Sequence, residues 1–289
     1  MPMTRAFSGL VLLPAVVAAS AWAQAPSRET GVPSAAEILP PITSMALAAP
    51  NFRWHKVQTA HADLYFPENE YKRPVMARYA KAGEAAIVGN MEWLRGAPTE
   101  ARLHLFFVKS RLDMRQFVGG TPGGSAIETE GTAFLVANDS VRPALRHETM
   151  HLLAWRAWGP PAASWLSEGL ATAAVPACRG LNADEIAAVL DRSHLLVPLD
   201  SLRQNFTRAA EEGVVHYYES ASLVRYIDRT FGRKKLRALW STGGLANVKP
   251  LLGIDAATLE RNWRATIAGT KAPTTWPALW SEIRAVGCE

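Results

Sequence analysis

The sequence predicts an α+β fold, in which a small mixed sheet packs on the helix that carries the motif HETMH and a mainly helical C-terminal half follows. Three observations predict this class. Three segments have the composition and alternation of strands, and all of them end by Asn138. A long helical pattern separates the first from the second. Beyond Asn138 the pattern is helical almost to the end of the chain.

The expected elements of the first half are a strand, a helix, a strand, a loop and a strand. The helix has Pro74 in its first turn and is closed by Gly96. The second strand places Leu103, Leu105 and Phe107 on one side. In order, the five segments are His61–Glu68, Tyr71–Leu94, Arg102–Ser110, Gly119–Ser125 and Thr132–Asn138.

Residues 1–23 have the features of a secretory signal peptide. Arg5 supplies an early positive charge, an apolar run extends from about Leu10 to Ala19, and Ala21-Trp22-Ala23 fits a cleavage site. The alternative is a transmembrane anchor, but the run is short, because spanning takes about 20 residues. The sequence therefore predicts a secreted or periplasmic protein without a stable membrane span after cleavage.

The rest of the chain is expected to form a lead and one folded domain. Residues 24–50 are rich in Ala, Pro and Ser and show no sustained period, which predicts a flexible lead and leaves its removal as a pro-segment open. Residues 51–289 form the domain, with an α+β part at 51–158 and a helical part at 159–289.

The net charge and the cysteine content restrict the expected partners and covalent links of the chain. The formal net charge is +5 without a basic stripe, so nucleic acid is not an expected partner. The chain has two cysteines, Cys178 and Cys288. Export favours a disulfide between them, and two buried free thiols are the alternative. The sequence does not indicate the oligomeric state.

The segment RHETMHLLAWRAWGPPAASWLSEGLATAA (146–174) carries the chemistry. His147 and His151 are four residues apart, so on a helix they project from one face. Two imidazoles placed in this way can bind one divalent metal ion. Glu148 lies beside the first histidine, where its carboxylate can take a proton from water without being a ligand.

A catalytic zinc ion takes three protein ligands and keeps one position open, and Glu168 is the third candidate. The first helix is expected to be capped by Asp139 or Ser140 and to run through Trp158 to a Gly-Pro-Pro break. The second, Ser164–Ala174, carries Glu168 among apolar residues. The alternative is two ordinary amphipathic helices, since such a motif also arises by chance.

At these residues the chain resembles a known family. HETMH followed by WLSEGLA is similar to the gluzincin zinc metallopeptidases, specifically the peptidase MA-like domains of exported bacterial proteins. The resemblance covers most of 51–267, strongly at the motif and loosely at FRWHKVQTAHADLYF, HYYESASLVRYIDRTFG and TLERNWRATI. It implies one zinc ion held by His147, His151 and Glu168, with Glu148 as general base.

The resemblance has departures and one further candidate. Thermolysin-like members have an aspartate four residues after the third ligand, which orients a zinc histidine. Thr172 stands there, so the partner is expected elsewhere. Members also place a tyrosine or histidine that stabilises the oxyanion. Tyr217 is the better match, with Tyr218 and His216 behind it, and an aromatic core residue is the alternative reading.

The sequence thus favours an exported zinc metallopeptidase acting on a peptide or protein, with Glu148 accepting the proton of the attacking water. The strand Thr132–Asn138 is expected to pair with the extended substrate. One alternative is an exported binding or assembly protein on a peptidase-like scaffold, although a structural zinc site needs no base. Another is a metal-free helical interaction module. Substrate identity and internal or terminal cleavage stay open.

Overall fold

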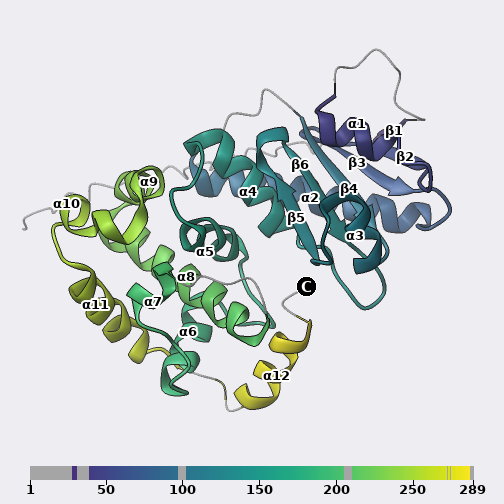
Figure 1. Ribbon diagram of the computed structural model, residues 1–289. Coiled ribbons are helices and arrows are strands. Elements are labelled where there is room, and N and C mark those ends of the chain that lie inside the picture. Colours follow the sequence, from purple (N-terminus) through teal and green to yellow (C-terminus); the bar gives the residue numbers. More distant parts are fainter. Residues whose placement is uncertain are drawn as a thin grey trace, which may run out of the picture.

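The computed structural model describes residues 28–30, 39–96, 102–204, 210–271, 273 and 275–286. It confirms the α+β class: a small mixed sheet is followed by a mainly helical C-terminal half (Figure 1). The helices α4 (Leu145–Trp158) and α5 (Ser164–Ala174) lie where the two halves meet. The predicted signal peptide, residues 1–23, lies outside the described residues.

The sheet has six strands in the order β1-β2-β3-β4-β6-β5. The central pairs β3–β4 and β4–β6 are parallel, whereas β1–β2, β2–β3 and β5–β6 are antiparallel. The strands are β1 (Arg28–Thr30), β2 (Trp54–Gln58), β3 (Ala62–Pro67), β4 (Leu103–Val108), β5 (Gly124–Ile127) and β6 (Thr132–Val136).

Both faces of the sheet are buried, which explains why the central strands read as almost continuous apolar runs. Successive side chains alternate between the faces. Leu105 and Phe107 pack with α2 (Arg73–Leu94) and α4 in the main core. Phe106 faces the opposite layer, formed with α1 (Pro41–Leu47) and α3 (Arg111–Val118).

The expected flexible lead at residues 24–50 is wrong in part, because β1 and α1 both lie within it. Thr43 and Ala46 are buried, and the Trp54 indole donates a hydrogen bond to the Ala46 carbonyl at 2.9 Å. The backbone N–H of Ile42 donates to a carboxylate oxygen of Glu130 at 2.6 Å. The contact with Glu130 joins residues 88 positions apart, and such a contact leaves no periodic signal in a seven-residue helix.

The expected loop at Gly119–Ser125 is wrong at its end, since β5 begins at Gly124. β5 pairs with β6 and forms one edge of the sheet. A four-residue strand rich in small residues shows no clear alternation, so only its partner strand defines it. The preceding helix α3 was also missed, although Ser110 and Asp113 form a reciprocal capping box at its start.

In the sheet half, a short helix, η1 (Glu128–Glu130), precedes β6.

In the helical half, the other helices pack around α5 and the long helix α8. The remaining helices are α6 (Ala183–Arg192), α7 (Leu199–Gln204), α8 (Ala210–Phe231), α9 (Arg233–Thr242), η2 (Gly244–Asn247), α10 (Val248–Leu252), α11 (Ala256–Ala268) and α12 (Trp276–Val286).

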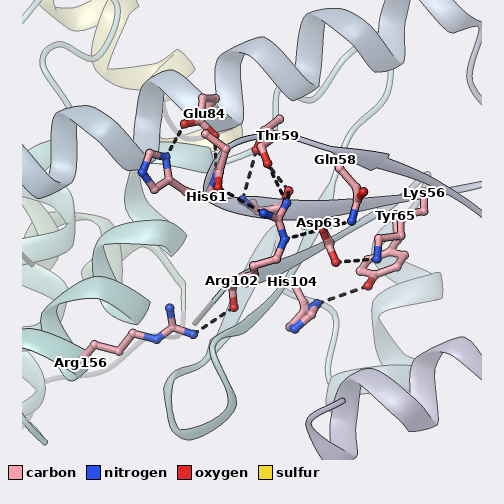
Figure 2. Close-up of polar contacts among 12 residues, drawn as sticks. Lys56, Gln58, Thr59, His61, Asp63, Tyr65, Glu84, Arg102, His104 and Arg156 are labelled. Atoms are coloured by element: carbon pink, nitrogen blue, oxygen red, sulfur yellow. Dashed lines mark hydrogen bonds and ion pairs between the residues drawn. The ribbon is translucent and has the colours of Figure 1, made fainter. Parts of the chain in front are cut away.

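A buried polar cluster at the start of β3 and β4 fixes the far end of α4 (Figure 2). Asp63 is fully buried, pairs with Lys56 Nζ at 2.7 Å and accepts from Arg102 Nε at 2.8 Å. Arg156, in the last turn of α4, donates to the Arg102 carbonyl at 3.2 Å. The cluster therefore ties the sheet to the helix that carries the motif.

The beginning of α4 is held from two other sides. Asn90 of α2 donates to the Arg146 carbonyl at 2.8 Å and to the Thr149 hydroxyl at 2.9 Å. The Arg146 guanidinium donates to the Ala174 carbonyl at the end of α5, with 3.0 Å between the two atoms. These bonds lock the turn on either side of His147 against its neighbours.

Two further predictions concern the compartment. Cys178 is buried and disulfide-bonded. Its expected partner, Cys288, lies outside the described residues. Among the residues that the structure describes, no helix combines the length and the apolar character needed to cross a lipid bilayer.

Candidate metal centre

The centre is built by α4 and α5, which follow one another along the chain and pack together. Gly159 ends α4, and the Trp240 side chain of α9 donates to its carbonyl at 2.8 Å. The Trp240 carbonyl in turn accepts from Ala162 N at 2.7 Å. α9 therefore holds the Gly-Pro-Pro break in the shape that folds α5 back onto α4.

Gly169 of α5 lies at a close approach between this helix and α8. A Cβ atom at Gly169 would lie 2.8 Å from the carbonyl oxygen of Ser220, nearer than a real side chain permits. Any larger residue would push α8 away from α5. Because α8 also carries Tyr217, the glycine helps to set the distance between that tyrosine and the motif.

The expected cap of α4 is wrong. α4 begins at Leu145 with Ala144 before it, and no side chain caps it. Asn138 accepts hydrogen bonds from the backbone N–H groups of Ser140 and Val141, each at 2.8 Å. The expected cap residue Ser140 is therefore part of a separate turn.

His147, His151 and Glu168 converge on one point. The Nε2 atoms of the two histidines are 3.1 Å apart, and Glu168 Oε2 lies 3.2 Å from His147 Nε2 and 3.3 Å from His151 Nε2. Glu168 and His151 are buried, with exposures of 3% and 6%. Three potential ligand atoms thus form a compact triangle that could hold a metal ion.

The charge state of Glu168 suits such a role. Burial alone would raise the pKa of this carboxyl group, but hydrogen bonds from His147 and His151 outweigh it and hold the pKa well below its ordinary value. Glu168 is therefore an anion at neutral pH, the form in which a carboxylate binds a cation.

The outer nitrogen of each histidine faces a hydroxyl group of α5. Ser167 Oγ lies 3.1 Å from His151 Nδ1, and Thr172 Oγ1 lies 3.5 Å from His147 Nδ1. Partners of this kind fix the orientation of ligating imidazoles. The partner was expected elsewhere than at Thr172; this holds for His151, whose partner is Ser167, but His147 has a long contact with Thr172 itself. Ser167 was missed, and its position directly before Glu168 was the available signal.

Glu148 lies beside the triangle and outside it. Its carboxylate faces a cleft and is only 6% exposed. Burial raises its pKa above the ordinary value, while His147 and His151 act in the opposite direction. A Cβ atom at Gly124 of β5 would lie 2.3 Å from Glu148 Oε1, so the missing side chain makes room for this carboxylate.

The cleft has a volume of about 810 Å³ and runs along the N-terminal part of α4. Tyr217 lines it, and its ring centre lies 5.9 Å from that of His147. Tyr218 also lines the cleft but packs in an apolar cluster with α12, whereas His216 does not line it. Tyr217 therefore combines a place in the cleft lining with a ring contact to His147 of the motif.

Comparison with known proteins adds no assignment. No protein-family model matches the chain, and no curated protein matches it.

Proposed function

We propose that the protein is an exported, zinc-dependent metallopeptidase of the gluzincin type, similar to peptidase MA-like domains. The observation that carries the proposal is the triangle of His147, His151 and Glu168 with Glu148 beside it in a cleft. A structural metal site needs no neighbouring carboxylate that stays outside the ligand set. Here that carboxylate faces the space in which a substrate would lie.

The geometry fits zinc. Ligand atoms of a tetrahedral zinc ion lie roughly 3.3 Å from one another, because each bond is about 2.0–2.1 Å long. The three separations between 3.1 and 3.3 Å agree with this. Two imidazoles and a carboxylate also form a ligand set known from catalytic zinc sites. When bound, zinc supplies Lewis acidity and makes water easier to deprotonate.

Glu148 carries out the proton transfers. It accepts a proton from the attacking water as the water oxygen bonds to the peptide carbon. It then donates this proton to the amide nitrogen as the carbon–nitrogen bond breaks, so the products are a carboxylic acid and an amine. Its raised pKa suits the first step, because a stronger base takes the proton from water more readily.

Tyr217 and β5 complete the proposed site. Tyr217 donates a hydrogen bond to the carbonyl oxygen as negative charge develops on it. The earlier expectation that the strand Thr132–Asn138 binds substrate is wrong, because β6 is paired on both sides by β4 and β5. The edge strand β5 takes over this role, since an extended peptide can add to a free sheet edge.

Export is part of the proposal. A signal sequence at residues 1–23 places the enzyme outside the cytoplasm. The disulfide at Cys178 fits an oxidising compartment. Peptides or proteins of that compartment would be the substrates.

The test is a peptide library incubated with the zinc-loaded parent, the Glu148→Gln variant and a Glu92→Gln control on the exposed face of α2. The parent and the control should cleave, and chelation should stop them. Glu148→Gln should keep its zinc and lose about 10²–10⁴-fold in rate. Cleavage by Glu148→Gln at the parental rate would reject the base. Zinc binding without any cleavage would favour the binding or assembly protein.

A further inference from the structure

The cleft beside the triangle has a distinctive lining. Most of it is apolar and comes from small or branched residues such as Ala85, Leu145 and Val175. Its charged lining residues are Arg111, Arg142, Arg146 and Glu148. Glu148 is the proposed base, so the side chains left to recognise substrate charge are arginines.

The three arginines differ in how far the fold uses them. Arg146 is half-buried and donates to the Ala174 and Ala86 carbonyls. Arg111 and Arg142 are exposed, and neither forms an ion pair within the part of the chain that the structure describes. Arg111 donates one hydrogen bond, to the Thr121 carbonyl at 3.1 Å. Their guanidinium groups therefore retain donors for a ligand.

The fold brings these two arginines to the same end of the cleft. Asn138, after β6, donates to the Lys109 carbonyl, after β4, at 2.9 Å. Arg111 follows Lys109 by two residues. Arg142 follows directly after the turn that Asn138 closes with Val141, in which the Asn138 N–H donates to the Val141 carbonyl at 3.0 Å. One hydrogen bond thus joins the two segments from which the arginines extend.

We propose that Arg111 and Arg142 bind a carboxylate of the polypeptide substrate and give the cleft a preference for acidic peptides. The inference rests on the proposed function. Guanidinium groups suit this task because their planar donors match the two oxygens of a carboxylate. The apolar remainder of the cleft would accept the uncharged residues beside it. An Asp or Glu side chain and a free C-terminus supply the same group.

Binding is measured with the zinc-loaded Glu148→Gln variant, so that no peptide is consumed. The probes are fluorescein-labelled octapeptide pools of Ala, Leu and Ser. One pair differs by a single Glu or Gln at each position in turn, and a second pair by a C-terminal carboxylate or amide. The Glu pool or the free-carboxylate pool should bind about tenfold more tightly than its neutral counterpart, and salt should reduce the difference.

The added substitutions Arg111→Ala and Arg142→Ala should abolish this preference while leaving the neutral pools unaffected. Each single variant should remove part of it. Arg115→Ala is the matched control, because Arg115 is exposed on the same helix and does not line the cleft. The pair of peptide pools that shows the difference in binding identifies the source of the carboxylate: an acidic side chain for the Glu and Gln pools, or the C-terminus for the free-carboxylate and amide pools. Because both arginines are exposed, thermal melting should be unchanged.

Equal binding of charged and neutral pools, or a preference that survives the double substitution, would overturn the inference. A further pool carries phosphoserine in place of Glu, and tighter binding of this pool than of the Glu pool would also overturn the inference. These results are separable from the proposed function. Hydrolysis by the parent without a charge preference would leave the peptidase and remove the carboxylate site. A charge preference without any hydrolysis by the parent would leave the carboxylate site and remove the peptidase.

Discussion

Two fully buried carboxylates, one in the sheet half and one in the helical half, are stabilised in opposite ways. Asp63 lies between Lys56 and Arg102. Burial would raise its pKa, but these cations outweigh burial and lower it. Glu219 of α8 accepts one long hydrogen bond, from Val197 N at 3.5 Å, and its second oxygen has no hydrogen-bond partner. Burial raises the pKa of Glu219 to about 8.

The difference shows what a buried carboxylate needs in order to stay ionised. Burial outweighs the charge of Arg264, so Glu219 is mainly protonated at neutral pH, whereas Lys56 and Arg102 outweigh burial and keep Asp63 an anion. Glu168 lies between the two halves and is also an anion, held by imidazoles. Imidazoles are metal ligands as well as hydrogen-bond donors, so this third cluster can exchange protons for a metal ion.

The largest effect is expected from breaking the Asp63 cluster. Asp63→Asn removes the ion-pair partner of buried Lys56 and should lower the free energy of unfolding by about 3–5 kcal/mol. Chemical denaturation measures it, with exposed Asp139→Asn as control. Zinc content per folded chain should not change. A free energy of unfolding equal to that of the parent would show that the ion pair between Asp63 and Lys56 does not stabilise the fold.

A smaller effect is expected where Glu148, the proposed general base, lies against β5. Gly124→Ala should keep zinc but displace Glu148, because the new Cβ would lie 2.3 Å from Oε1. A misplacement of about 1 Å can cost on the order of 10²-fold in rate. Gly120→Ala is the control, since its Cβ would meet Pro122 at an ordinary 3.6 Å. If both variants turned over equally, Glu148 would not be held by this contact.

The smallest effect concerns Glu219 and is a pH dependence. Its pKa is raised from 4.5 to about 8 on folding, so the folded state retains the proton over that range. The resulting stability is present below pH ~4.5 and is lost as the pH rises through about 8, by about 2 kcal/mol between pH 6 and 8. Glu219→Gln should remove this slope from denaturation curves. An unchanged slope would mean that the carboxyl group titrates normally.

The sequence predicted the parts of the fold and site that have a local signature. The spacing of His147 and His151 on one helix, and the apolar run around Glu168, need only neighbouring residues to be recognised. Gly124 and the pair Arg111 and Arg142 escaped recognition because the contacts that place them join separate segments of the chain. For the same reason β5 was taken for loop, since only its pairing with β6 makes it a strand.

The metal content of the purified protein tests the central claim most directly. The zinc-loaded parent should carry about one zinc per chain, as a single three-ligand site requires. His151→Ala should lose most of it, because the variant removes one corner of the triangle. His194→Asn, at an exposed histidine remote from the motif in sequence, should keep it. Full occupancy in His151→Ala, or no zinc in the parent after loading, would contradict the assigned centre.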